Sequence, residues 1–595
     1  MGAFKSAVIT KKGQALLAKV VAGTAKFNFT SIKTSENTLT GDLASKTGIG
    51  TIKQTADVAS VIRQNDSNVK VSASFSNTNL NAGYYVRNIG LYATDPQEGE
   101  ICYSISVADE SVATADWMPP FNGIGVSSLM VDLVTAVSNA SSVNVTVDPT
   151  ASATVAQIID LQSQIDDVRS FVGYEEDNIY GVEVDFSSKK ITRIAGNEHL
   201  TAGADFDGLD PWGGRKRCIL TDGGVVLAYR GETGYTEAGV TTQAITVGDT
   251  EYPSGTKVQA MVEQPIFYVK AVPVKAKNAT SGKGKQYVKA RFYISPTPKS
   301  GFVVPRAFYD NYGIPQDKIY LAAYEGCIWS DASQKYDLLD TLPMEVELDL
   351  FSSIANAKPA SGLSKNLTRA NTRKLCTNRG AGWQLHNIFA MAVTEWLLMV
   401  EYASLDPQRK VGRGICDFTD DGSTNMAVVT GATSGIGNGS GIPDGGTDGK
   451  CSVTYRGEEN LWGNIWTWLD CINILAKGDN SIWLTKIGTT PVDNTTEGYE
   501  CMDAWATHSG GYISAFGIDP DHPEILIPTE ASGSDTFADY VWENHNYNGF
   551  LVARLGGSWD IGSMCGFYLN LRDASSARAR NISGRLLYVP QSKVA

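Results

Sequence analysis

The sequence predicts a multidomain, mainly β protein whose C-terminal domain is of the α+β class. With 595 residues, the chain exceeds the roughly 250–300 residues that one hydrophobic core organises. Short runs that alternate apolar and polar residues recur between turn residues, and glycine is abundant, at 59 copies. After about residue 356 two helical patterns precede a loop-rich stretch that holds nine of the twelve tryptophans. Large aromatic rings among few regular elements indicate a compact domain with a ring-filled core.

The charge and cysteine content exclude several classes of protein. With a net charge of −14, the chain lacks the basic surface expected of a nucleic-acid binder, and an acidic chain is repelled by anionic lipid. The first residues hold no long apolar segment and no run is long enough to span a bilayer, so we expect neither a signal peptide nor membrane insertion. The nine cysteines form no C-x-x-C pair and no two histidines lie three to five residues apart. We therefore expect buried, reduced thiols from folding in a cytosol, and neither a metal nor a cofactor.

Residues 1–150 are predicted to form a small, mostly β domain. One amphipathic helix is expected over residues 11–21. The stretch 69–77 alternates with period two, which places four apolar side chains on one face of a strand: Val69, Val71, Ala73 and Phe75.

Residues 151–173 carry a short heptad pattern. Apolar residues recur at spacings of three and four, at Ile158, Leu161, Ile165, Val168 and Val172. This seam predicts a short coiled coil, trimers included among the compatible states. A single amphipathic helix packed on its own domain is the alternative, because two heptads are too few to decide.

Residues 174–355 are predicted to form a β-rich middle module, and residues 356–595 the C-terminal domain. In the module, residues 182–194 read as a hairpin. Two further strands are expected on either side of a Lys/Gly/Ser-rich turn at 278–286. In the C-terminal domain, helices are predicted near 367–377 and 385–402.

Two local patterns suggest chemistry that their surroundings do not support. Residues 430–437 read Thr-Gly-Ala-Thr-Ser-Gly-Ile-Gly, like a nucleotide-binding turn, but no helix former follows to hold a pyrophosphate, so a flexible surface loop is expected. Glu458 and Glu459 are adjacent and would point to opposite faces of a strand, which makes them a poor pair for glycan hydrolysis. Nearby acidic residues are expected to be solvated rather than calcium ligands: Asp417, Asp420, Asp421, Asp444 and Asp448.

Three C-terminal segments carry a family resemblance. Residues 463–468 read Gly-Asn-Ile-Trp-Thr-Trp, residues 552–559 Val-Ala-Arg-Leu-Gly-Gly-Ser-Trp, and residues 583–585 Ser-Gly-Arg. In this order they resemble the signature segments of the formylglycine-generating-enzyme family, which implies a C-type-lectin-like fold. Val552 and Leu555 stand where that family has arginines. The enzymes of that family use a cysteine pair, which no pair here matches, so we expect no enzyme activity.

The segment 556–590 resembles the variable region of phage proteins diversified by retroelements. In that family an error-prone reverse transcriptase rewrites adenines, mostly in Asn codons. The residues altered in this way form the receptor-binding surface. Met564 does not fit an Asn codon. The resemblance implies these receptor-binding positions: Tyr547, Leu551, Ser558, Asp560, Ile561, Ser563, Met564, Tyr568, Asn570, Arg572, Asp573, Ala577 and Ala579. Ordinary loop residues of a C-terminal hairpin are the alternative. Trp466, Trp468 and Trp559 are assigned to the core.

The N-terminus carries a second resemblance. Residues 4–10, Phe-Lys-Ser-Ala-Val-Ile-Thr, and 85–92, Tyr-Val-Arg-Asn-Ile-Gly-Leu-Tyr, are similar to phage tail-collar fibre proteins. Together the resemblances imply a trimeric tail fibre, made in the host cytoplasm and carried on the virion. Its residues 1–150 would attach to baseplate or tail proteins, and its tip would bind a protein or glycan receptor on the host. A glycan-cleaving tail enzyme and a variable cell-surface adhesin remain alternatives.

Overall fold

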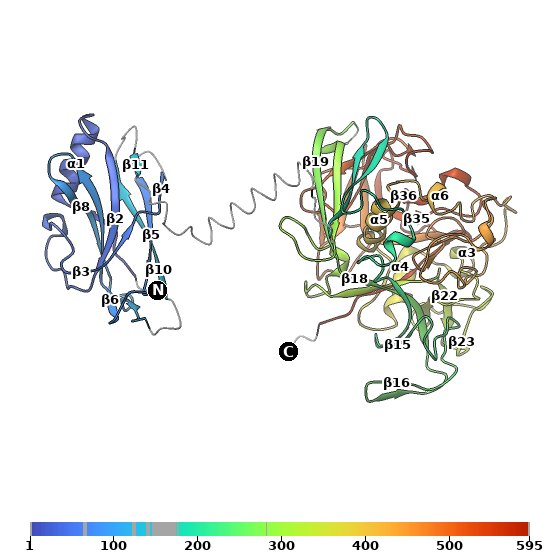
Figure 1. The fold of residues 1–595 in the computed structure, drawn as a ribbon. Coiled ribbons are helices and arrows are strands. Elements are labelled where there is room, and N and C mark those ends of the chain that lie inside the picture. The colour runs from blue at the N-terminus through green and yellow to red at the C-terminus, as the bar shows by residue number, and fades with distance from the viewer. Residues whose placement is uncertain are drawn as a thin grey trace. The chain divides into compact units, whose positions relative to one another are not determined.

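The computed structural model describes residues 3–63, 68–121, 127–137, 143–145, 174, 178–280 and 282–592. The chain divides into two compact units at residues 162/163, and each is described by itself (Figure 1). Both are built mainly of strands, which confirms the predicted multidomain, mainly β fold class. The predicted coiled coil at 151–173 lies outside the described residues. In the described part of the chain, no helix combines the length and apolarity that a membrane span requires.

The N-terminal unit begins with the predicted helix, α1 (Lys11–Val21). Thr10 caps it, because its hydroxyl accepts a hydrogen bond from the Gly13 amide at 3.0 Å. Leu16 and Val20 lie one turn apart and are buried, so the amphipathic face packs on the sheet beneath it. The spacing that predicted the helix also determines which face it buries.

Two sheets share the core of the N-terminal unit. The larger sheet has the order β1 (Val8–Ile9), β8 (Gly99–Val107), β7 (Asn88–Asp95), β2 (Phe27–Ser35) and β11 (Val143–Val145), with β3 (Ile52–Asp57) beside β2. The smaller has the order β10 (Ser128–Ala136), β5 (Asn68–Ser76) and β4 (Ser60–Arg63). β6 (Tyr84–Val86) pairs with β9 (Asp116–Met118), and the turn η1 spans Leu43–Ser45. Val69, Val71, Ala73 and Phe75 are all buried, which confirms the period-two prediction for β5.

The C-terminal unit contains both predicted hairpins. β12 (Tyr180–Asp185) pairs with β13 (Lys190–Ala195), and β19 (Tyr268–Asn278) pairs with β20 (Lys285–Ser295). The sheet continues through β32 (Ala515–Ile518) to β33 (Pro528–Glu530). Strands from the middle region and the C-terminal region therefore lie in one sheet.

A second sheet also crosses the predicted boundary at 355/356. Its order is β15 (Val226–Tyr229), β14 (Lys216–Thr221), β18 (Val258–Pro265), β21 (Lys318–Ala322), β38 (Leu586–Tyr588) and β25 (Trp383–Leu385). The predicted boundary thus does not separate two compact units, because strand pairing joins the middle region to the end of the chain. Local composition changes at 356, but long-range pairing places both sides in one core.

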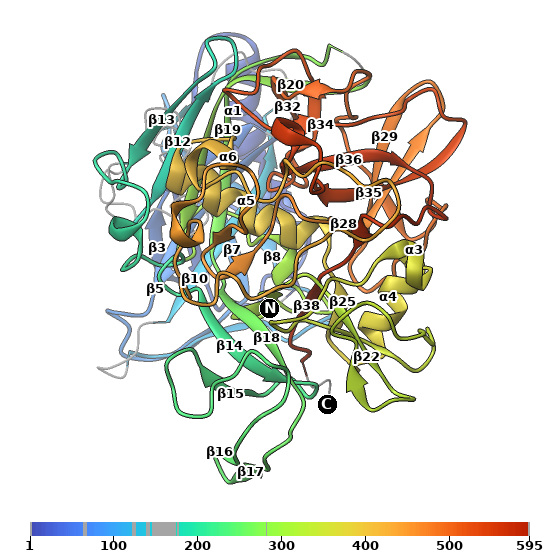
Figure 2. The same cartoon turned by 90° about the vertical axis from the view of Figure 1, so that its right-hand side faces the viewer.

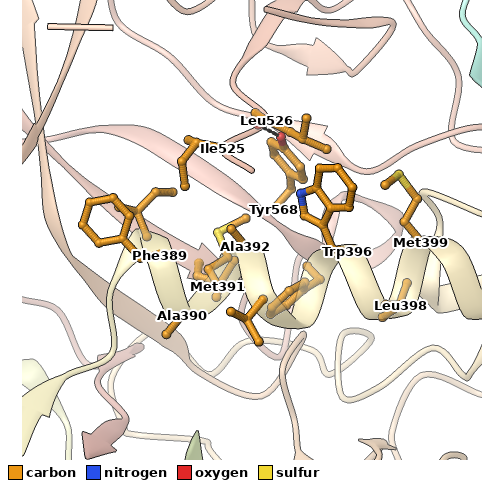
Figure 3. Packing of buried hydrophobic residues seen from close by; sticks show 14 of the residues in the cluster. Phe389, Ala390, Met391, Ala392, Trp396, Leu398, Met399, Ile525, Leu526 and Tyr568 are labelled. Carbon is orange, nitrogen blue, oxygen red and sulfur yellow. Dashed lines mark hydrogen bonds between the residues drawn. The ribbon is translucent and has the colours of Figure 1, made fainter. Parts of the chain in front are cut away.

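A buried helix and a third sheet complete this core. α5 (Ile388–Tyr402) is buried along nearly its whole length and is mostly apolar (Figure 3), as expected of a helix in the core, and the buried set also includes Glu395 and Glu401. α4 (Arg369–Thr377) packs beside β25. Both helices were predicted. The third sheet has the order β30 (Tyr499–Cys501), β29 (Asn480–Thr485), β28 (Trp466–Ala476), β35 (Gly549–Gly556) and β36 (Gly566–Asp573), with β37 (Ile582–Ser583) beside β28.

Shorter elements complete the unit. They are η2 (Ala204–Phe206), β16 (Ile245–Val247), β17 (Thr250–Tyr252), η3 (Arg306–Phe308), β22 (Cys327–Ser330), β23 (Lys335–Tyr336), β24 (Leu350–Ser352), α3 (Gly362–Lys365), α6 (Pro407–Lys410), η4 (Pro443–Gly445), β26 (Thr454–Tyr455), β27 (Glu458–Glu459), β31 (Gly511–Tyr512), β34 (Tyr540–Val541) and η5 (Gly562–Met564). Figure 2 labels β16, β17, β22, α3, α6 and β34 among them.

Candidate functional site

A buried tryptophan frame supports the C-terminal loops. Trp466, Trp468 and Trp559 are at most 4% exposed, which confirms their assignment to the core. The Trp468 indole donates to the Leu367 carbonyl at 2.8 Å, and the Trp559 indole donates to the Asp420 carboxylate at 3.1 Å. The Trp468 and Trp559 rings are thus each fixed by packing and by one polar contact, as buried indoles usually are.

The loop between β35 and β36 stands on this frame. Gly557 has φ +98°, and a Cβ there would lie 2.5 Å from the Cys565 sulfur, so the turn requires glycine. Ser558 donates to the Asp560 carboxylate at 2.8 Å, and the Gly562 amide donates to the Cys416 carbonyl at 2.8 Å. The 3₁₀ turn η5 in the same loop has no buried residue. The loop is therefore anchored at its base and open at its tip.

The structure separates the predicted receptor-binding positions into two groups. Nine are exposed or half-buried: Tyr547, Asp560, Ile561, Ser563, Met564, Arg572, Asp573, Ala577 and Ala579. Four are at most 5% exposed and do not face solvent as folded: Leu551, Ser558, Tyr568 and Asn570. β36 is covered on both faces from Gly566 to Leu571, so alternate residues along it are not alternately exposed. The sequence interpretation of these four as surface residues is corrected on this ground.

Tyr568 illustrates the buried group (Figure 3). Its ring lies beside α5, and its hydroxyl donates to the Leu526 carbonyl. Its ring centroid is 5.5 Å from that of Phe516. Burial raises the pKa of the Tyr568 hydroxyl well above its usual value. A residue held in this way supports the surface and does not contact a partner.

Three half-buried rings, Tyr512, Tyr540 and Trp542, link the two ends of the exposed group. We call them the aromatic row. The Tyr512 and Ser563 hydroxyls are 2.8 Å apart, and the Tyr512 and Tyr540 ring centroids are 5.2 Å apart. The Tyr540 and Trp542 centroids are 4.6 Å apart, and the Arg572 guanidinium lies 4.7 Å from the Trp542 ring centroid. The row therefore runs from Ser563 to Arg572.

Sequence reasoning did not find the aromatic row, because strand pairing creates it. Tyr512 on β31 pairs with Tyr540 on β34, and Trp542 forms a parallel bridge to Asn570 on β36. No local spacing connects residue 512 to residue 542. The one available signal was the density of aromatic residues in the C-terminal region.

An ion pair engages Asp573, one of the exposed or half-buried positions. The Arg554 and Asp573 side chains are 2.9 Å apart, and the Arg554 guanidinium lies 4.5 Å from the Trp466 ring centroid. Burial lowers the pKa of Arg554 to about 10 and raises the pKa of the Asp573 carboxyl. Asp573 is therefore engaged inward, although part of its side chain reaches solvent.

The acidic residues at 417–421 are paired with cations rather than merely solvated. Arg580 contacts Asp420, and its Nη1 lies 3.4 Å from Asp421. Hydrogen bonds from Thr424 lower the pKa of the Asp421 carboxyl to about 2. Arg413 lies 2.6 Å from Asp417. Among the described residues no group of three or more His, Cys, Asp or Glu side chains has the arrangement of a metal site.

Glu458 and Glu459 point to different partners, as adjacent residues of a strand do. Glu458 accepts from Arg215 and, at 3.0 Å, from Thr394. Glu459 accepts from the amides of Gly431 and Thr433 at 2.8 and 2.7 Å. No α-helix follows residues 430–437, as predicted, but Glu459 holds the segment, and Thr430 and Thr433 are buried, so it lies only partly at the surface. The two carboxylates stabilise the fold and do not face each other across a cleft.

No family model matches the chain, and no curated protein matches it. Solved structures similar to it include "Major Tropism Determinant U1 Variant", at 13% identity and a TM-score of 0.22, covering 67% of this chain and 77% of that chain. "Major Tropism Determinant I1 Variant" aligns at 10% identity and a TM-score of 0.21, covering 69% of this chain and 94% of that chain.

Proposed function

We propose that the chain is a bacteriophage tail fibre that attaches the virion to a host receptor through its C-terminal surface. The observation that carries this proposal is the aromatic row, which joins Ser563 to Arg572 over a buried tryptophan frame. Tyr, Trp and Arg are the residues most enriched at the energetic centres of protein interfaces. Rings with few rotatable bonds lose little conformational entropy when they bind.

Four of the exposed positions lie next to the two ends of this row in the sequence. Asp560, Ile561 and Met564 flank Ser563, and Asp573 flanks Arg572. Ile561, Trp542, Ala577 and Ala579 pack against the same buried cluster as Trp466, so the loops at 560–564 and 574–580 belong to one surface. We infer that a retroelement diversifies this surface, and that the frame beneath it has the C-type-lectin-like fold implied by the sequence resemblance.

The remaining assignments belong to the same proposal. Residues 1–150 attach the fibre to the tail or baseplate, and residues 151–173 join copies of the chain, most simply three, as a coiled coil. Several weak sites on one fibre bind together with greater strength than one site alone. The tip acts by binding and not by catalysis, and the engagement of Glu458 and Glu459 in the fold supports this reading.

Binding of the full-length chain to intact bacteria tests the proposal. The chain is labelled with a fluorophore and titrated against strains that do and do not adsorb the phage carrying this gene. We expect Tyr540→Ala or Arg572→Ala to weaken binding to adsorbing strains by about tenfold or more. Tyr312→Ala is the matched control, because Tyr312 is 61% exposed and lies outside the row. Equal binding by all variants would contradict the proposal.

A further inference from the structure

Two cysteines meet beneath the loop at 560–564. All nine cysteines are free thiols, and seven of them are buried. The structure brings Cys416 and Cys565 together on either side of Gly562, although 149 positions separate them in the sequence. Residue spacing gave no sign of this contact.

Backbone and side-chain contacts hold the two thiols together. The Cys416 carbonyl accepts from the Gly562 amide at 2.8 Å, and the Cys565 amide donates to the Gly562 carbonyl at 3.1 Å. The Gln408 side-chain amide lies 3.6 Å from the Cys416 sulfur and 3.4 Å from the Gly562 carbonyl oxygen. The Cys565 thiol donates to the Ser558 carbonyl at 3.2 Å. Gly562 is therefore hydrogen-bonded to the backbones of both cysteines, so Cys416 and Cys565 cannot separate without breaking these contacts.

The geometry points to a disulfide site: we propose that Cys416 and Cys565 form a bond under oxidising conditions and clamp the loop at 560–564. Both cysteines are buried, but the adjoining 3₁₀ turn η5 has no buried residue, so the pair lies close beneath the surface that a small oxidant such as a peroxide meets. A particle outside a cell meets such conditions, whereas the host cytosol keeps thiols reduced. The consequence for receptor binding rests on the proposed function, but formation of the bond does not.

The chemistry balances with hydrogen peroxide as the oxidant. The neighbouring Cys565 side chain lowers the pKa of the Cys416 thiol, which makes Cys416 the nucleophile, while burial raises the pKa of Cys565. The Cys416 sulfur attacks one peroxide oxygen, the O–O bond breaks, and the leaving hydroxide takes the proton that Cys416 lost. The Cys565 sulfur then attacks the Cys416 sulfenic acid, and the departing hydroxide leaves as water with the Cys565 proton. Two thiols and one peroxide yield one disulfide and two waters.

Peptide mapping of the folded, full-length chain tests the bond directly. The reduced protein is treated with a small excess of hydrogen peroxide, quenched, alkylated under denaturing conditions and digested. We expect one disulfide-linked peptide pair containing residues 416 and 565, and a fall in free thiols from nine to seven. Cys501 serves as an internal comparison, because it is exposed whereas Cys416 and Cys565 are buried. It should be oxidised singly or remain free.

Two further measurements keep the inference separable from the function. Cys416→Ser and Cys565→Ser should each abolish the linked pair, and Cys501→Ser should leave it unchanged. Oxidation should raise the Tm of the wild type and of Cys501→Ser, but not of Cys416→Ser, because a cross-link restricts the unfolded chain. Recovery of residues 416 and 565 as separate free or singly oxidised peptides would overturn the proposal. A linked pair without any change in receptor binding would leave the disulfide standing and contradict only its role at the surface.

Discussion

The C-terminal surface contains two groups of residues that are held differently: the buried ones, which we call the frame, and the exposed or half-buried ones, which we call the rim. In the frame, Trp559 and Tyr568 are almost completely buried, and each polar group meets a specific partner. In the rim, Asp560 and Ser563 are exposed and make one side-chain contact each. Close-packed interiors respond to every lost atom, whereas exposed side chains can be exchanged at little cost. The same 35 or so residues near the end of the chain can thus combine a fixed fold with an alterable surface.

Breaking the frame should have the largest effect. Trp559→Ala removes a fully buried indole from a cluster with Ile415, Ala427 and Ile465. We expect the C-terminal unit to lose about 3–5 kcal/mol of unfolding free energy in a urea titration followed by far-UV circular dichroism. Trp117→Ala in the N-terminal unit is the control, since Trp117 is 51% exposed. A loss at residue 559 no larger than that at residue 117 would show that the frame is not rigidly packed.

Acid should lower the unfolding free energy of the C-terminal unit through His386. This imidazole is fully buried, and burial together with the nearby Arg585 charge lowers its pKa from 6.5 to about 3. The unfolded chain then binds a proton that the folded chain rejects, so stability is present above pH 6.5 and is lost as the pH falls toward 3. Between about pH 7 and about pH 4 the loss should be on the order of 3 kcal/mol.

His386→Gln removes this titrating group. Urea midpoints measured across that range should fall less steeply with acid in His386→Gln than in the wild type. His199→Gln, at an exposed histidine, should follow the wild type. Identical slopes for all three proteins would show that His386 is protonated equally in the folded and unfolded chains.

A smaller effect is expected from one hydroxyl of the frame. Tyr568→Phe keeps the ring but removes the hydrogen bond to the Leu526 carbonyl, which is left without that donor. We expect a loss of about 1–2 kcal/mol by urea denaturation. The same substitution at Tyr547, which is 41% exposed, should leave stability unchanged. Equal effects at the two positions would contradict the division into frame and rim.

The rim should tolerate substitution. Asp560→Asn and Ser563→Ala should each change the unfolding free energy by less than about 0.5 kcal/mol, because both side chains are exposed. The same variants should change which bacterial strains the labelled chain binds. Destabilisation comparable to that of Tyr568→Phe would place these residues in the frame.

Local elements were predictable from the sequence, and long-range assembly was not. Helix α1 and the hairpin of β12 and β13 follow from short-range spacing, capping and turn residues. The joining of β21 to β38 depends on pairing between residues 320 and 588, which no local pattern encodes. For the same reason the boundary at 355/356 is not observed as a boundary between compact units.

The candidate surface was predicted in part. Asp560, Ser563 and Arg572 are exposed as the variable-region resemblance implied. Tyr568 and Asn570 are buried because β36 is covered on both faces, so the period-two rule gives no exposed side there. Segments that are distant in the sequence cover β36, and this depends on the tertiary structure. A single sequence shows it only after the chain is folded.

The most direct test of the division into frame and rim is sequencing of the 3′ end of this gene across many virions from one lysate. The account predicts substitutions at the nine exposed or half-buried positions, each matching an adenine in a nearby template copy: Tyr547, Asp560, Ile561, Ser563, Met564, Arg572, Asp573, Ala577 and Ala579. It predicts none at the four buried positions, Leu551, Ser558, Tyr568 and Asn570. Substitutions spread equally over both groups, or a uniform sequence without a template copy, would contradict it.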